Sequence, residues 1–571
     1  MHWFRAPQRR TTLLYLLAIE AFAAMLVFGP WNETTRPERI YATVLVGSFT
    51  LLVLFLSRRI AFSLLTSAWL FMLIEICSML KDQYLTTPLV APDLIYFVNR
   101  DTVDVVLRYP ILAISTVLGL LLLPLALFGI WRIDKPLLLA RLRPWPRRAW
   151  QSLGLAVSAI AVTLTMMPDG PFRDVYAKGM WLAMIDKSYL SDFFVSIYAT
   201  QIEPVKIPDD VDRSIVWNEQ VANTGDPAHK PDIVAVLEES TFDPRMLALC
   251  KLPMCKRKMF DADKLTRAHG YLQVHTWGGG TWTSEFALMT GIAHTLFGSA
   301  GLYAPFNLAP RVTYSLPRML KQSGYRTVVI YPTSGSFINA RNAYAFYGAD
   351  RQIDNSETGL GWESPDTDVF KVFDKVYAEE RATYPDQPLF IFVLTLRQHG
   401  PHMTPLKDLP APYNKPLFPT QTDDWLNLNL GNYLYRLEQS DLAMAAFEKR
   451  LFDTEKPRVL LHFGDHQPSF DGAINNLNKV VPKGITEPQK VTYYMLKSNF
   501  VPHEKIDYPV LDIIYLGGLL LDVADLRRND YYEANTLLRE RCKGRYFDCE
   551  TPKLLDSYHA YIFEKLHALK D

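Results

Sequence analysis

The chain has 571 residues, with 60 lysine and arginine residues balanced by 60 aspartate and glutamate residues. This neutral balance gives no indication of a nucleic-acid or acidic partner, and we expect no nucleic acid. The length exceeds that of one small domain. Long apolar runs concentrate in the first third, whereas the remainder has the mixed composition of a soluble domain that buries a large core. We therefore predict two parts that fold in different solvents.

Five apolar runs in the first third are long enough to be candidate membrane spans, although the first and last are short or interrupted by polar residues. They are Leu13 to Phe28, Ile40 to Leu56, Ile60 to Leu80, Pro110 to Trp131, and Ala149 to Met167. No small-residue cleavage site follows the first run, so we interpret it as a retained anchor and not as a signal peptide.

Basic residues concentrate in alternate loops between these runs and predict the orientation. They are Arg5, Arg9 and Arg10, then Arg58 and Arg59, and then Arg132, Lys135, Arg141, Arg143, Arg147 and Arg148. Loops with this excess are cytoplasmic. An odd number of spans places the rest of the chain on the opposite side, which in a bacterium is the periplasm. We predict a transmembrane domain at 1–167, juxtamembrane helices and a linker at 168–229, and a periplasmic domain at 230–571.

Cysteine usage agrees with an exported domain. Cys77 lies in the third apolar run, whereas the other four form two close pairs, Cys250 with Cys255 and Cys542 with Cys549. An even count at short spacing favours two local disulfides, and buried unpaired thiols are the alternative. The last pair lacks histidines at metal-site spacing, so we expect no zinc knuckle there.

Four short, β-branched apolar runs follow residue 230, and helical segments lie between them. They are "DIVAVLEES", "YRTVVIYPTS", "PLFIFVLTLRQHGPH" and "PRVLLHFGDHQP". Continuous apolar runs are typical of strands buried on both faces, and their alternation with helices predicts an α/β fold with a mostly parallel central sheet. Ligands of such sheets bind outside the carboxyl ends of the strands.

Polar residues follow three of these runs at the point where each ends. They are Glu238 and Glu239, His399 and His402, and Asp465 and His466. Each group alone is weak evidence, because a strand-end acid often caps a helix and a strand-end histidine is more often structural. Together they supply carboxylates and imidazoles at one sheet edge, which is the mixed ligand set that a divalent cation requires.

The stretch "HTWGGGTWTSEF", residues 275–286, places three glycines before a group of hydroxyl side chains. Glycines let a backbone approach a phosphate closely, and the following residues read as a helix whose N-terminus favours an anion. A hydroxyl that binds a divalent cation becomes a good nucleophile, because the cation stabilises its deprotonated form. The alternative is an ordinary glycine-rich loop leading to a helix N-cap.

With these motifs in this order, the chain resembles the membrane-anchored lipoteichoic acid synthase and phosphoglycerol transferase family of the alkaline phosphatase and sulfatase superfamily. The phosphoethanolamine transferases are its cousins. The resemblance covers nearly the whole chain and implies a five-span anchor followed by a sulfatase-like domain. It also implies one or more divalent metal ions (manganese, magnesium or zinc). The implied roles are metal ligands at Glu239, Asp465 and His466, a metal-bound nucleophile at Thr281, and a substrate-side histidine at His399.

One segment departs from the family pattern. In lipoteichoic acid synthases the segment that corresponds to "YPTSGSFINARNAY" carries a histidine, a tryptophan and an arginine that hold the phosphoglycerol group. Anchored on Phe337 and Asn339, those three places fall on Tyr331, Ile338 and Ala340. Arg341 lies one residue away and is either a forked phosphate donor or a surface arginine. We name Arg341, Asn339 and His402 as candidate substrate-binding residues.

The resemblance implies a multi-pass enzyme of the bacterial inner membrane that moves a phospholipid headgroup to an envelope glycan through a phospho-threonine intermediate. Phosphatidylglycerol is the preferred donor, and a phosphoethanolamine transferase is the alternative. A true sulfatase or phosphodiesterase is less expected, because "TWTSEF" lacks the Cys- or Ser-x-Pro-x-Arg pattern of sulfatases. An inactive membrane scaffold is also less expected, because every predicted ligand type is present.

Overall fold

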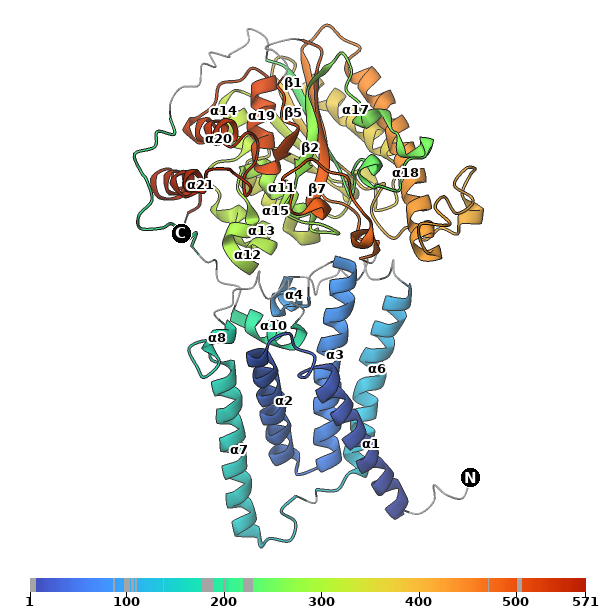
Figure 1. The fold of residues 1–571 in the computed structure, drawn as a ribbon, viewed down its shortest axis with the longest axis vertical. Coiled ribbons are helices and arrows are strands. Elements are labelled where there is room, and N and C mark those ends of the chain that lie inside the picture. Colours follow the sequence, from blue (N-terminus) through green and yellow to red (C-terminus); the bar gives the residue numbers. More distant parts are fainter. Residues whose placement is uncertain are drawn as a thin grey trace. The chain divides into compact units, whose positions relative to one another are not determined.

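The computed structural model describes residues 7–85, 88–96, 103, 107, 110–136, 138–176, 188–198, 202, 204–218, 230–470, 472–500 and 506–570. The chain divides into two compact units (Figure 1), Met1–Gln83 with Thr87–Gln201, and Tyr84–Thr86 with Ile202–Asp571. Much of the segment predicted to hold juxtamembrane helices and a linker lies outside the described residues, namely 177–187, 199–201, 203 and 219–229.

The described secondary structure of the N-terminal unit is helical (Figure 1). Its helices are α1 (Pro7–Phe28), α2 (Arg36–Ser57), α3 (Ile60–Leu85), α4 (Ala91–Tyr96), α6 (Pro110–Ile133), α7 (Pro144–Met166), α8 (Arg173–Tyr176), α10 (Tyr189–Val195) and the 3₁₀ turn η2 (Ser196–Tyr198).

Three of these helices are long and apolar enough to cross a membrane, where the sequence predicted five spans. They are Arg36–Ser57, Ile60–Asp82 and Pro144–Met166, whereas Thr12–Phe28 and Val117–Ile133 are shorter apolar stretches. A span needs about 20 apolar residues, and the polar residues before Thr12 shorten the first stretch. Leucines on α6 point outward, with Leu121 60% and Leu125 67% exposed, as suits a hydrocarbon solvent.

The N-terminal unit is held together by close contact between α2 and α7. A Cβ placed on Gly154 would lie 2.4 Å from the ring of Phe55, so only glycine allows this approach. The side chain of Gln151 donates to the carbonyl of Phe55 at 2.9 Å. A glycine and a polar side chain of α7 thus add to the hydrophobic packing of this unit.

The C-terminal unit is built on one eight-stranded sheet, with strands β1 (Asp232–Glu238), β2 (Thr266–Gln273), β3 (Arg326–Ile330), β4 (Arg351–Ile353), β5 (Leu389–Thr395), β6 (Arg458–Gly464), β7 (Val491–Ser498) and β8 (Val510–Asp512). The order is β4-β3-β5-β1-β6-β7-β2-β8, and β7 alone runs antiparallel to its neighbours. The mixed, mostly parallel sheet confirms the predicted α/β class. The described residues between β6 and β7 hold only short 3₁₀ turns, so no helical crossover reverses the chain for parallel pairing.

The central strands end at the same level, and this register positions the site. Glu238 is paired with Thr395 of β5 and with Gly464 of β6. Every residue of β1 and β5 is buried, because helices cover both faces of the sheet. Residues that follow β1, β5 and β6 therefore meet at one edge.

Helices flank the sheet, and Figure 1 shows α17 and α18 on one face and α11, α14, α15, α19 and α20 on the other. The helices are α11 (Thr281–Thr290), α12 (Gly298–Leu302), α13 (Ala304–Asn307), α14 (Leu316–Gln322), α15 (Ala340–Tyr347), α16 (Asn355–Thr358), α17 (Asp366–Thr383), α18 (Asp424–Leu451), α19 (Leu516–Val523), α20 (Asp530–Arg541), α21 (Pro552–His559) and the π-helix η13 (Ala560–Lys565). Short 3₁₀ turns occupy Pro244–Met246, Pro253–Cys255, Lys258–Phe260, His294–Phe297, Ala309–Arg311, Phe337–Asn339, Leu406–Asp408, Ala473–Asn476, Pro488–Lys490 and Ile513–Tyr515.

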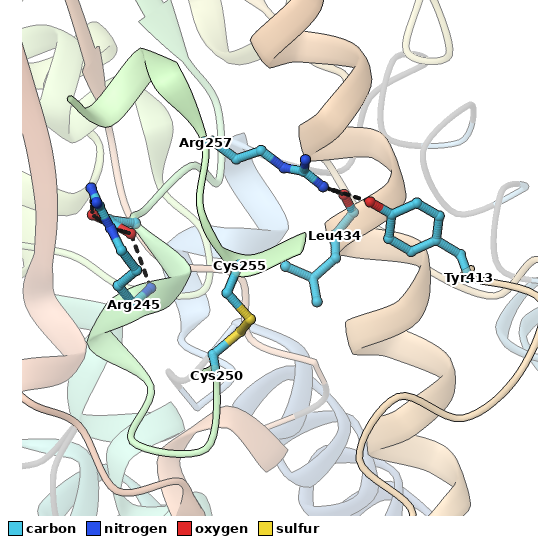
Figure 2. Close-up of a disulfide and its surroundings, with 7 residues drawn as sticks. Arg245, Cys250, Cys255, Arg257, Tyr413 and Leu434 are labelled. Atoms are coloured by element: carbon cyan, nitrogen blue, oxygen red, sulfur yellow. Dashed lines mark hydrogen bonds and ion pairs between the residues drawn. A yellow bond between two sulfur atoms is a disulfide. The ribbon is translucent and has the colours of Figure 1, made fainter. Parts of the chain in front are cut away.

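Both predicted disulfides are present, Cys250–Cys255 and Cys542–Cys549. Figure 2 shows the first of them beside Arg257, whose guanidinium donates to the hydroxyl of Tyr413 at 2.5 Å and to the carbonyl of Leu434 at 3.3 Å. The disulfide and this arginine fix the loop after β1 against α18.

Candidate functional site

Three predicted metal ligands converge where β1 and β6 end. The Nε2 atom of His466 lies 3.6 Å from Oε1 of Glu239 and 3.2 Å from Oδ2 of Asp465. One ligand atom from each of the three side chains lies within 4.8 Å of the other two. All three residues are buried, with exposed fractions of 3% or less. The register of the two strands delivers these side chains to one point.

The predicted nucleophile lies beside this group. The Oγ1 atom of Thr281 is 3.4 Å from Nε2 of His466. Thr281 is the first residue of α11, a ten-residue helix. The free N–H groups at a helix N-terminus attract an anion, so this hydroxyl is located where a phosphate would bind.

Two glycines allow this arrangement. Gly280 adopts φ 84°, the left-handed region that glycine occupies without strain, and this turn starts α11 at Thr281. A Cβ on Gly464 would lie 1.8 Å from the carbonyl oxygen of Thr241. Any side chain at Gly464 would therefore push the end of β6 away from the loop that carries Glu239.

Neighbouring hydroxyl and amide groups hold the ligands in place. The backbone N–H of Ser240 donates to Oδ1 of Asp465 at 2.8 Å, and the Ser240 hydroxyl donates to Oε1 of Glu239 at 2.8 Å. The Ser284 hydroxyl donates to the backbone carbonyl of Asp465 at 2.8 Å. Thr283 donates to the carbonyl of Gly280 at 2.8 Å, so its hydroxyl stabilises the start of the helix, whereas the Ser284 hydroxyl ties the helix to the segment after β6. Sequence reasoning missed the role of Ser240, although its adjacency to a ligand is a usable signal.

The electrostatics of the three ligands are compatible with a divalent cation. Burial raises the pKa of the Asp465 carboxyl, while His466, the Thr281 hydroxyl and two backbone N–H groups act in the opposite direction. Two carboxylates buried side by side cost free energy unless a cation or proton compensates them. Two oxygen donors, one imidazole and an adjacent hydroxyl suit manganese, magnesium or zinc.

Glu285, four residues after Thr281, is buried behind the site. Burial raises its pKa to about 8, an effect that the nearby Asp465 reinforces and a hydrogen bond from Tyr344 opposes. A carboxyl that stays protonated at neutral pH adds no negative charge beside the predicted phosphate position.

His399 follows β5, the neighbour of β1. Its Nδ1 atom lies 2.7 Å from the carbonyl oxygen of Gly400 and therefore carries a proton, so Nε2 is the acceptor in the neutral ring. Its ring packs 4.7 Å from that of Trp362, which packs 5.3 Å from that of Phe337. Sequence reasoning missed Trp362, because nothing local links it to a histidine 37 positions later.

The three candidate substrate-binding residues all make contacts within the protein. His402 is buried against the rings of Tyr433 and Phe470, and burial lowers its pKa well below 6.5. The amide of Asn339 donates to the carbonyl of Pro305 at 3.0 Å.

Arg341 donates to the carboxylate of Asp354 at 2.5 Å while remaining 52% exposed. The same carboxylate accepts from the backbone N–H of Gly335 at 2.9 Å. Among the described residues the guanidinium of Arg341 bonds to Asp354 alone, and a role for Arg341 toward substrate stays a prediction.

The sequence profile of the family described as Sulfatase matches residues 231–524, more than half of the chain. The chain belongs to the sulfatase family. This family falls within the alkaline phosphatase superfamily, as the motifs predicted.

Two curated relatives match over part of their length. An uncharacterized protein of Haemophilus influenzae is 30% identical over 349 residues, which cover 59% of this chain and 61% of the relative. A putative cyclic beta-1,2-glucan modification protein of Rhizobium meliloti is 24% identical over 280 residues, covering 46% and 39%. The chain therefore spans less than two thirds of the length of either.

Among solved structures, the phosphoglycerol transferase GacH of Streptococcus pyogenes in complex with sn-glycerol-1-phosphate aligns with a TM-score of 0.48 and 17% identity. The alignment covers 64% of this chain and all of that one.

Proposed function

We propose that this sulfatase-family chain is a metal-dependent transferase that moves a phospholipid headgroup to a cell-envelope glycan. The observation that best supports this proposal is the position of the Thr281 hydroxyl. It lies at a helix N-terminus, 3.4 Å from Nε2 of His466 and beside two buried carboxylates. A hydroxyl, an anion-binding helix end and a cation-binding ligand set are the parts that phosphoryl transfer requires.

In the first half-reaction, the Thr281 oxygen attacks the phosphorus of the donor phosphodiester. A bond forms between Thr281 and phosphorus while the ester bond to diacylglycerol breaks, and diacylglycerol leaves as an alcohol with the proton that Thr281 gives up. The N–H groups at the start of α11 stabilise the charge on the phosphoryl oxygens. A divalent cation held by Glu239, Asp465 and His466 would supply charge neutralisation and a lower hydroxyl pKa.

In the second half-reaction, an acceptor hydroxyl attacks the phosphorylated Thr281. The new ester bond forms, the bond to Thr281 breaks, and the acceptor proton returns to the threonine oxygen. We assign His399 to hydrogen bonding with the phosphoryl oxygens or to proton transfer, because its Nδ1 bonds to the carbonyl of Gly400 and its Nε2 is an acceptor in the neutral ring.

Phosphatidylglycerol is our preferred donor, and an envelope glycan is our preferred acceptor. The resemblance to the phosphoglycerol branch supports the donor. A relative described as a putative glucan modification protein supports the acceptor.

The apolar helices of the N-terminal unit support a membrane anchor beside the lipid donor. We propose that the two shorter apolar stretches also cross the bilayer, with local thinning of the bilayer, which gives five spans. The domains would then be 1–167, 168–229 and 230–571, with the last in the periplasm of a bacterial inner-membrane protein.

A phosphoethanolamine transferase is the second candidate, and the aromatic stack favours it. The rings of Phe337 and Trp362 are half-buried beside His399, and an ammonium group is attracted to aromatic faces. The glycerol-binding histidine, tryptophan and arginine of the family are also absent at Tyr331, Ile338 and Ala340.

Diacylglycerol release separates these candidates. The full chain is incubated in detergent with phosphatidylglycerol or phosphatidylethanolamine, each labelled in the diacylglycerol part. We expect release from phosphatidylglycerol, its loss in Thr281→Ala, and its retention in Thr420→Ala, which alters an exposed threonine. Release from phosphatidylethanolamine alone would reverse the donor assignment. Release by Thr281→Ala would show that Thr281 is not the nucleophile.

A further inference from the structure

A concave site lies at the same sheet edge, where β2 and β8 end. This cavity, which we call the His275 cavity, has a volume of about 60 Å³. Its walls come from the end of β2, the segment before β7, and the loop that the Cys542–Cys549 disulfide closes. None of the predicted metal ligands lines it.

A histidine–carboxylate pair forms the buried polar part of this cavity. Nε2 of His275 lies 3.0 Å from both carboxylate oxygens of Asp512, and the two side chains are 4% and 2% exposed. The carboxylate accepts, so Nε2 carries the proton and Nδ1 is the acceptor in the neutral ring. Among the described residues Nδ1 has no hydrogen-bond partner. A buried acceptor without a partner is costly, which indicates a ligand that donates to it.

An exposed aromatic ring forms the outer part of the cavity. Phe547 is 51% exposed, and its ring centroid lies 5.0 Å from that of His275. The buried ring of Tyr546 supports it from 4.7 Å. An apolar flat surface beside a buried acceptor matches a ligand with both C–H faces and hydroxyl groups, which is the chemistry of a sugar ring.

The charges of the cavity favour a neutral ligand. Its two cationic side chains are already engaged, because Lys490 pairs with Glu487 at 2.7 Å and Arg545 donates to the carbonyl of Gly484 at 2.9 Å. Asp548 adds a carboxylate that accepts from hydroxyl groups. An anionic ligand would meet more carboxylates than available cations.

The cavity is linked to the nucleophile by a short chain of contacts. His275 precedes Thr281 by six residues, and the N–H of Gly278 between them donates to the carbonyl of Gln467 at 2.9 Å. The amide of Gln467, the residue after a predicted metal ligand, donates to the carbonyl of Val491 at 2.6 Å, next to Lys490 of the cavity wall. Strands lie about 4.8 Å apart, so β2 and β6, with β7 between them, are separated by about 10 Å. A ligand of two or three sugar rings would span this distance.

We propose that the His275 cavity is a saccharide-binding subsite that holds the acceptor glycan while a hydroxyl further along it attacks phosphorylated Thr281. The inference rests on the proposed function for the acceptor role, and on the cavity alone for saccharide binding. Phe547 stacks on one face of a sugar ring, Nδ1 of His275 accepts from a sugar hydroxyl, and Asp548 accepts from a second hydroxyl.

Saturation-transfer difference NMR on the full chain tests saccharide binding. The protein is kept in a detergent without a sugar headgroup and mixed with a set of disaccharides built from glucose, galactose, mannose and N-acetylglucosamine. We expect saturation of at least one disaccharide, and a decrease of at least threefold in Phe547→Ala and in Asp548→Asn. Phe346→Ala, which removes a 38% exposed phenylalanine on α15, is the matched control and should keep the signal.

The contradicting results are distinct from failure of the proposed function. No saturation of any disaccharide, or equal saturation in wild type and Phe547→Ala, overturns the saccharide site even if Thr281 becomes phosphorylated. Saturation that depends on Phe547, without any adduct on Thr281 after exposure to lipid, supports the saccharide site and overturns its role as the acceptor subsite.

Discussion

Two histidine–carboxylate groups lie at the same edge of the sheet, and their geometry gives them different chemistry. At the ends of β1 and β6, two carboxylates and an imidazole direct ligand atoms to one point beside the hydroxyl of Thr281. At the ends of β2 and β8, His275 faces a single carboxylate of Asp512 and an exposed phenyl ring. The first arrangement concentrates negative charge for a cation, whereas the second pairs a single carboxylate with one ring nitrogen of a histidine and leaves the other ring nitrogen as an acceptor for a hydroxyl.

The largest expected effect is the loss of the hydroxyl from the first group. Thr281→Ala should decrease headgroup release by at least about 10³-fold, because no attacking oxygen remains. Thr281→Ser, which keeps the hydroxyl, should retain measurable release. Diacylglycerol formation measures headgroup release by both variants. If a folded Thr281→Ala variant still releases diacylglycerol, the first group does not supply the nucleophile, and the chemical distinction between the two groups is lost.

Removal of one metal ligand is expected to have the next largest effect. Asp465→Asn should weaken metal binding by more than about 100-fold, because loss of an outer-sphere partner alone costs 10- to 100-fold. Metal content by mass spectrometry after dialysis measures the change. Asp548→Asn, beside His275, is the matched control and should keep its metal. Equal metal loss from both variants would show that metal binding does not distinguish the two groups.

The pH dependence of the free energy of unfolding should report on a buried histidine that lies behind the second group. His559, whose Nε2 contacts the hydroxyl of Tyr546 behind His275, has its pKa lowered by burial to about 4. The unfolded chain therefore binds a proton between about pH 6.5 and 4 that the folded chain does not, so stability falls as pH falls through this window. The loss is up to about 3 kcal/mol. His559→Gln should flatten the dependence in urea unfolding, and an unchanged slope would contradict the assignment.

The smallest expected effect concerns the carboxylate of the second group. Asp512→Asn should lower the free energy of unfolding by about 1 to 3 kcal/mol, since His275 and the N–H of Ile514 lose part of their acceptor. Asp386→Asn, at an exposed position, should be neutral. A neutral Asp512→Asn variant would mean that the buried pair contributes no stability.

Local patterns predicted the first group and failed to predict the second. The runs that became β1 and β6 are continuous and apolar, and the residues directly after them are the three predicted ligands. By contrast, β2 includes half-buried polar positions, and β7 carries the buried Lys497, which pairs with Asp263 and Glu448. Apolar patterns do not detect a strand whose buried charge is compensated by distant residues.

Long-range side-chain contacts were also beyond sequence reasoning. Trp362 lies 25 positions after Phe337 and 37 before His399, yet its ring contacts both. His275 was visible only as the first residue of a glycine-rich stretch, and its partner Asp512 lies 237 positions away. Three of the five predicted spans are long apolar helices in the described residues, and the other two stay a prediction.

The most direct test of the central claim is the mass of the proteolytic peptide that contains Thr281 after the full chain has been exposed to phospholipid without acceptor. A mass increase equal to one phosphoglycerol group, located on Thr281 and absent from Thr281→Ala, is the predicted result. A phosphoethanolamine mass on the same residue would keep the nucleophile and change the donor. An unmodified Thr281 peptide in a preparation that contains metal and releases diacylglycerol would contradict the covalent intermediate.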